Sequence, residues 1–221
     1  MLDSIGYKLL DKLSKTAFWE WFVKNCMSGL TTRIYGYPKF PMEDYFKIVD
    51  AMKPDALYAF VCSDYKSIGS GSIRAVSDAL FTHAGLIING KDRDTKVIHM
   101  RTTGLNREHM IALLREVDYF AVVEIHLLSK QSLDLVKTRI ESTWLKRQEL
   151  IYDYEERLGN DQNRLYCSEY VLTLCKDVCS ITPKMSTVLG REVFAPDNIL
   201  DIGKVVYSNH SGIVKKYIRK P

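Results

Sequence analysis

The sequence lacks both a long apolar run and the cysteine pattern of a disulfide-bonded secreted protein. No window of its 221 residues reaches the roughly 18 consecutive apolar residues that a transmembrane helix requires. Its five cysteines are odd in number and contain no C-x-x-C spacing, which favours a reduced compartment. Acidic residues and lysines interrupt the N-terminal stretch, so no signal peptide is expected there. Together these absences predict a cytoplasmic protein without a membrane span.

Strong charge of either sign is also missing. The net charge of +4 is small, and the basic cluster near the C-terminus at 215–220 is short, so a nucleic-acid partner is not expected. Cys175 and Cys179 are four residues apart, as neighbours on a helix would be, but no further metal ligands are evident near them. The sequence thus predicts neither a metal site nor a cofactor. A hydrophobic content of 46% is ordinary for a folded globular protein.

The order of the expected elements indicates an α+β protein with a mostly antiparallel sheet. Apolar residues at helical spacing predict a helix over residues 1–29, and Pro41 suits the first turn of a second helix that runs to about Met52. Strands at 84–88 and 96–100 flank an Asn-Gly turn, which is the strongest short-range signal for a hairpin. Further helices are expected at 73–80, 107–116 and 131–157, and further strands at 56–62, 118–128, 204–207 and 213–218.

Cys167 stands where a core helix is expected to begin. Turn-forming residues precede it at 159–163, and apolar residues follow it at helical spacing, namely Tyr170, Val171, Leu174, Cys175 and Val178. At the start of a helix, the unpaired backbone N–H groups and the positive end of the dipole favour a thiolate over a thiol. Cys167 is therefore the candidate nucleophile. The alternative is a small buried thiol of the core.

A cysteine nucleophile needs a base, and the base needs a polar partner that orients it. His83 lies at the mouth of one predicted strand and His99 lies in the next, so the hairpin is expected to bring their side chains to about 5 Å from each other. Taken singly, each histidine is more typical of a structural residue, whereas the pair favours a catalytic role. Glu124, an acid within an apolar strand, competes with His99 for the orienting role. A solvent-facing position on that strand is the simpler explanation for Glu124.

These motifs resemble those of the permuted NlpC-type papain-like cysteine hydrolases, in the branch that includes YiiX and YaeF. The resemblance rests on Phe81-Thr82-His83-Ala84-Gly85-Leu86, Lys96-Val97-Ile98-His99 and Tyr166-Cys167-Ser168-Glu169-Tyr170-Val171. It covers about residues 52–205. It implies a circularly permuted papain-like fold, in which the histidine strand precedes the cysteine helix. The expected organisation is an N-terminal helical extension at 1–52 and a hydrolase domain at 53–221.

Position by position, the resemblance implies that Cys167 is the nucleophile and His83 the general base. His99 then falls on the third polar position, where many members of the branch carry a carboxylate. The backbone N–H of Cys167 would supply part of an oxyanion hole. Tyr166 and Glu169, close to the nucleophile in sequence, are secondary candidates. Glu169 either complements the helix dipole or contacts substrate.

The leading hypothesis is a cysteine peptidase or amidase that hydrolyses an amide bond through an acyl-enzyme. The resemblance implies a peptidoglycan stem peptide, or another γ-glutamyl or isopeptide amide, as the substrate, and hence a cell-wall partner. Two alternatives stay open. The more distant retinol-acyltransferase relatives suggest a lipid acyltransferase or esterase, with the N-terminal helix at a lipid surface. The other alternative is an assembly component whose N-terminal helices dock onto protein partners, for instance in a phage particle, which would make the protein virion-associated.

Overall fold

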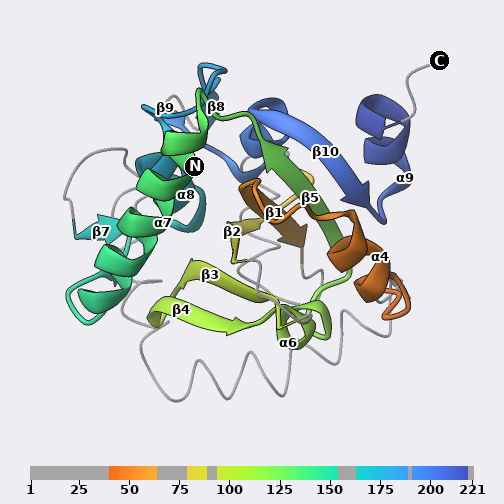
Figure 1. Ribbon diagram of the computed structural model, residues 1–221, viewed down its shortest axis with the longest axis horizontal. Helices are drawn as coiled ribbons and strands as arrows, with labels where there is room; N and C mark the ends of the chain where they lie inside the picture. The colour runs from red at the N-terminus through yellow and green to blue at the C-terminus, as the bar shows by residue number, and fades with distance from the viewer. Residues whose placement is uncertain (1–39, 64–78, 89–93, 154–162, 189–190, 219–221) are drawn as a thin grey trace.

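The structure, a computed structural model, describes residues 40–63, 79–88, 94–153, 163–188 and 191–218 (Figure 1). The helix expected at 1–29 and nearly all of the helix expected at 73–80 lie outside these residues. The Asn-Gly turn of the predicted hairpin lies outside them as well. The division into an extension at 1–52 and a domain at 53–221 therefore stays a prediction.

A six-stranded sheet in the order β10-β5-β1-β2-β3-β4 forms the centre of the described structure, and all neighbouring strands in it are antiparallel. Its strands are β1 (Tyr58–Ser63), β2 (His83–Ile88), β3 (Lys96–Arg101), β4 (Gly104–His109), β5 (Tyr119–Ile125) and β10 (Gly203–Ser208). This confirms the prediction of a mixed helix-and-strand protein whose sheet is mostly antiparallel. Strands β1 and β5 are nearly continuous apolar runs because both of their faces are covered.

Helices and two small sheets surround this central sheet. The helices are α4 (Asp44–Ala51), α6 (Met110–Leu114), α7 (Lys130–Leu145), α8 (Cys167–Cys175), α9 (Ser211–Ile213), the 3-10 helix η3 (Pro196–Asp201) and the π-helical turn η4 (Val214–Ile218). The small sheets pair β6 (Ile151–Tyr152) with β7 (Arg164–Leu165), and β8 (Ser186–Val188) with β9 (Arg191–Val193). Helices α4 and α8 confirm the helices expected before Met52 and from Cys167. No helix within the described ranges is long and apolar enough to cross a bilayer.

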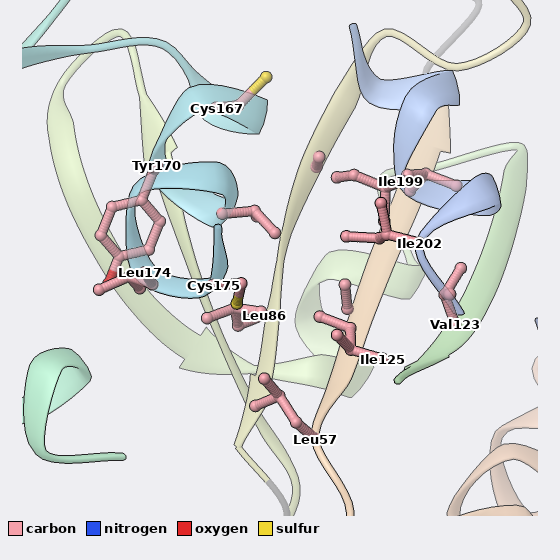
Figure 2. Packing of buried hydrophobic residues seen from close by; sticks show 14 of the residues in the cluster. Leu57, Leu86, Val123, Ile125, Cys167, Tyr170, Leu174, Cys175, Ile199 and Ile202 are labelled. Carbon is pink, nitrogen blue, oxygen red and sulfur yellow. The ribbon is translucent and has the colours of Figure 1, made fainter. Parts of the chain in front are cut away.

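The two faces of the sheet carry different side chains. One face, here called the α8 face, includes Ala59 and Leu86 and packs against α7, α8 and η3. Figure 2 shows part of this cluster, with Tyr170 of α8 beside the sheet. The opposite face, here called the aromatic face, includes Phe60 and Phe120 and packs against α4 and α6. Because side chains alternate between the faces along each strand, the face of any strand residue follows from its position.

The helix expected at 107–116 is wrong over its first three residues, 107–109, where the chain forms β4. Gly104, whose φ of 105° lies in the left-handed region, turns the chain back from β3. Residues from Gly104 to His109 then pair with β3, and helix α6 begins only at Met110. As an edge strand with few buried side chains, β4 lacks the apolar alternation that marks a strand. Pairing with β3, which the sequence of β4 does not reveal, decides its conformation.

Two further expectations are wrong, one in the length of a helix and the other in the type of an element. The helix expected at 131–157 stops at Leu145, and the N–H of Ile151 donates to the Asn163 carbonyl oxygen at 2.7 Å in β6 instead of continuing the helix. The strand expected at 213–218 is the short helix α9 followed by η4. Just before them, the Asn209 side chain accepts from the Phe120 N–H at 2.8 Å. This hydrogen bond lies where β10 ends beside β5, and helix α9 begins two residues later.

Candidate active site

Two imidazoles meet at the start of β2. His83 is the first residue of that strand, and its Nε2 lies 2.6 Å from Nδ1 of His99 in β3. Gly85 permits this approach, because a Cβ at Gly85 would lie 2.6 Å from both the His99 Cβ and the Ile98 carbonyl oxygen. The ring of Phe60 packs near both imidazoles, with centroid separations of 6.1 Å and 5.7 Å. The hairpin thus brings together the two histidines that the sequence paired.

A carboxylate that the sequence analysis missed completes this pair. Glu108 of β4 lies 2.9 Å from His99 Nε2 through its Oε1. In the register of β3 with β4, Glu108 is opposite Val97, so it lies diagonal to His99 on the same face. Arg101 donates to Glu108 and also to Glu116, at 3.0 Å in the second case. This partner can be found only after residues 104–109 are recognised as a strand, since its contact depends on the register.

Burial sets the charge states of this chain of side chains. It holds the pKa of His83 well below the ordinary value of 6.5, and the neighbouring His99 and Arg101 lower it further. Burial also lowers the pKa of His99, although the hydrogen bond to Glu108 opposes that shift. The pKa of Glu108 is lowered, chiefly by its hydrogen bond with His99. At neutral pH both imidazoles are therefore uncharged, and Glu108 is ionised.

These charge states determine the tautomers. An ionised carboxylate can only accept, so His99 carries its proton on Nε2 and presents Nδ1 as an acceptor. His83 then donates from Nε2 to His99, which leaves the lone pair of His83 on Nδ1. Arg101 Nε lies 3.4 Å from His99 Nε2, but the contact with Glu108 is shorter and charge-assisted. The chain from Glu108 through His99 therefore leaves a proton-accepting nitrogen on His83 at the start of β2.

Cys167 is the first residue of α8, where the sequence places it. The preceding residue has an extended backbone with φ −90° and ψ 171°, so the helix begins at the cysteine. The Cys167 side chain is 3% exposed, and α8 packs against β2 and β3. Figure 2 shows its sulfur at the free end of the helix, away from Leu174 and Cys175. The helix dipole therefore acts on this thiol in the direction that favours ionisation.

Cys175 and Cys179 provide a contrast at the other end of α8. Both carry free thiols, and they lie close enough to hydrogen bond, as their spacing predicts. The hydrogen bond to Cys179 and burial together raise the pKa of Cys175 well above its ordinary value. The thiolate form of Cys175 is thus disfavoured, so this thiol in the same helix serves as an internal reference for Cys167.

His83 hydrogen bonds to His99 through Nε2. The side chains of Cys167 and His83 belong to different faces of the sheet. Cys167 belongs to the cluster on the α8 face, whereas His83 pairs with Cys62, whose side chain belongs to the aromatic face. His83 is the first residue of β2, so its side chain lies at the end of the strand. A contact between the Cys167 thiol and the His83 imidazole therefore has to form past this end of β2.

Glu124, the competing candidate for the orienting role, does not approach the histidine pair. Its carboxylate lies 3.1 Å from the ammonium group of Lys53. On β1, Glu124 is opposite Tyr58, whereas His83 is opposite Cys62 four residues further along. The structure therefore places Glu124 in an ion pair away from the imidazoles.

Tyr166 and Glu169, the two secondary candidates next to Cys167, are both buried. The Tyr166 hydroxyl accepts the Phe194 N–H at 3.0 Å, so this side chain fixes a neighbouring segment of chain. Glu169 lies in the first turn of α8 and is 4% exposed. A carboxylate in a first turn is stabilised by the helix dipole, which is the simpler of the two roles expected for Glu169.

Among solved structures, the fold is similar to the crystal structure of the metalloprotein YiiX from Escherichia coli O157:H7. The match has a TM-score of 0.54 at 13% sequence identity, and it covers 72% of this chain and 98% of that chain. At this identity the likeness supports a YiiX-like fold alone. No protein-family model matches the sequence, and no curated protein matches it. Any assignment of function to this chain therefore depends on the geometry of the site.

The name of that structural neighbour raises the question of a metal site in this chain. Within the ranges given above, no three His, Cys, Asp or Glu side chains are arranged to hold a metal ion. The facing nitrogens of His83 and His99 are 2.6 Å apart, and the outer nitrogen of His99 faces Glu108. These donor atoms point at one another, whereas metal ligands point at a common centre. The described residues do not fit a metal.

Proposed function

We propose that this protein is a cysteine hydrolase that cleaves an amide bond through an acyl-enzyme on Cys167, with His83 as the base. The observation that carries the proposal is the hydrogen-bonded chain from Glu108 through His99 to His83, which ends at the start of β2. Helix α8, which begins with Cys167, packs against that strand. A nucleophile at a helix start, a base and a group that orients the base are the parts that cysteine catalysis needs.

In the proposed reaction, His83 Nδ1 takes the proton of the Cys167 thiol, and the resulting thiolate attacks the amide carbonyl carbon. The imidazolium that forms is stabilised through His99 by the ionised Glu108. The C–N bond then breaks, and His83 returns its proton to the leaving amine. A water molecule, deprotonated by His83, attacks the thioester, releases the acid and restores the thiol. The Cys167 backbone N–H would stabilise the oxyanion.

Transfer of the proton requires Cys167 Sγ and His83 Nδ1 to approach within hydrogen-bonding reach. Catalytic hydrogen bonds are often long or unformed in ligand-free sites and tighten when substrate binds. We infer that substrate binding at the end of β2 completes this contact. His99 and Glu108 hold the other side of the imidazole, so the thiol has to meet His83 at Nδ1.

The order of the parts along the chain supports a circularly permuted papain-like arrangement of the NlpC type. The strands that carry His83 and His99 come before the helix that carries Cys167. The resemblance of the motifs around His83, His99 and Cys167 to those of the NlpC-type hydrolases suggests amide substrates such as peptidoglycan stem peptides, or other γ-glutamyl and isopeptide amides. Hydrolysis of such an amide is therefore the reaction we assign to the site.

The proposal is tested by incubating the protein with a short stem peptide, quenching in acid and locating any acyl adduct by mass spectrometry. The expected result is an adduct on Cys167, amine release in the wild type, and neither in Cys167→Ala. Cys175→Ala is the matched control and should keep both signals, since that thiol lies at the other end of α8. Turnover retained in Cys167→Ala would contradict the proposal. Cleavage of acyl esters without cleavage of amides would replace the amide substrate by a lipid ester.

A further inference from the structure

Phe194 hydrogen bonds to both sequence neighbours of Cys167. Its backbone N–H donates to the Tyr166 hydroxyl at 3.0 Å, and its carbonyl oxygen accepts from the Ser168 hydroxyl. All three residues are buried, and Ser168 and Phe194 are fully inaccessible. Hydrogen bonds in such surroundings are costly to lose, because the remaining partner is left without water. The start of α8 is thereby tied to the chain just before η3.

Asp197, three residues after Phe194, holds the chain that leads into His83. Its two carboxylate oxygens accept from the backbone N–H groups of Leu80 at 2.9 Å and Phe81 at 2.8 Å. From the other side, the Ser63 hydroxyl of β1 donates to the Leu80 carbonyl oxygen at 2.6 Å. The approach to the start of β2 is therefore fixed between β1 and η3.

The turn between these two anchor points, residues 194–197, is itself fixed. The Asn198 side-chain oxygen accepts from the Ala195 N–H at 2.7 Å, and the Asn198 N–H donates to the Ala195 carbonyl oxygen at 3.0 Å. Pro196, the first residue of η3, has a restricted φ. Ile199 of the same helix packs into the cluster on the α8 face (Figure 2). A short turn with these restraints transmits a displacement from one end to the other.

We propose that residues 194–197 form a brace that sets the position of Cys167 relative to His83. Phe194 and Asp197 are its two positioning residues, and neither touches the reacting atoms. The brace joins the start of α8 to the start of β2, the two places whose separation decides whether the thiol meets the imidazole. A misplacement of about 1 Å in a catalytic pair can lower the rate about a hundredfold. A brace that fixes the distance between the two segments would prevent such a misplacement. The catalytic part of this inference rests on the proposed function.

Amide hydrogen exchange tests the brace without any reference to activity. Ser168→Ala removes one hydrogen bond on the side of the nucleophile. If the brace acts as a unit, the N–H groups of Leu80 and Phe81, on the side of the base, should exchange about three- to tenfold faster, the range expected for one hydrogen bond. Asn209→Ala is the matched control, because it removes side-chain hydrogen bonds to the backbone at the start of β5 instead. Unchanged exchange at Leu80 and Phe81 in Ser168→Ala would overturn the brace.

Alkylation with iodoacetamide, followed for each cysteine by mass spectrometry over a pH series, tests the catalytic part. Asp197→Ala should slow the labelling of Cys167 by at least about tenfold and shift its pH profile, while the labelling of Cys175 stays unchanged. Asp197→Asn keeps one acceptor oxygen and should recover part of the rate. If wild-type Cys167 is no more reactive than Cys175, the proposed function fails, and the exchange result alone decides the brace. If Cys167 is reactive and Asp197→Ala changes neither its rate nor its profile, the positioning role is wrong.

Discussion

Replacing Glu108 by Gln should slow the alkylation of Cys167 about 30-fold at neutral pH. When Cys167 ionises, the proton resides on His83, and the negative charge of Glu108 stabilises that imidazolium through His99. Hydrogen bonds of 2.6 Å and 2.9 Å and one imidazole ring separate the carboxylate from His83. The separation is therefore at most about 8 Å, and at an effective dielectric constant of about 20 the attraction is about 2 kcal/mol. That free energy corresponds to the 30-fold decrease in the thiolate–imidazolium population.

The assay is the second-order rate of iodoacetamide labelling, measured separately for Cys167 and Cys175 in each variant. Glu116→Gln is the matched control, because Glu116 binds the same Arg101 but does not contact His99. Glu116 is 58% exposed, so its loss should change the Cys167 rate by no more than about twofold. Equal effects of the two substitutions, or no effect of Glu108→Gln, would refute the assignment of Glu108 to the catalytic chain.

Three further predictions concern stability. Because His83 and His99 are buried and neutral, the unfolded state binds more protons than the folded state below about pH 6.5. The free energy of unfolding should therefore fall on acidification, by up to about 1.4 kcal/mol per pH unit for each histidine. Urea titrations at several pH values check this, and a flat profile would contradict it. Gly85→Ala should cost about 1–3 kcal/mol by overpacking against His99, seen as a lower urea midpoint, and an unchanged midpoint would show that the close approach is not required. Tyr207→Phe removes the 2.7 Å hydrogen bond between β10 and Asp44 of α4 and should cost about 1 kcal/mol in the same assay, whereas a gain in stability would show that this bond does not hold α4 in place.

The parts of the site that sequence alone predicts are those with local signals. Cys167 is placed at a helix start because turn formers precede it and a buried stripe follows it. His83 and His99 are paired because an Asn-Gly turn lies between two apolar strands, whose pairing the structure retains. In these places the local preference of the chain agrees with its tertiary contacts.

The parts that sequence does not reveal depend on contacts between distant segments. Glu108 reaches His99 through the register of an edge strand whose polar sequence reads as helix. Asp197 reaches Leu80 and Phe81 from more than a hundred residues away, and no spacing rule connects them. Helix α7 ends before Ile151 because that residue pairs with a segment beyond it. In each case tertiary pairing overrides the local pattern.

The central claim, that His83 activates Cys167, is tested most directly by labelling every cysteine with limiting iodoacetamide across a pH series in the wild type and in His83→Ala. We predict that wild-type Cys167 is modified faster than Cys175 from about pH 6 upward, and that His83→Ala removes most of this advantage. Uniformly slow labelling of all cysteines, or a Cys167 rate that is the same in His83→Ala, would contradict the account.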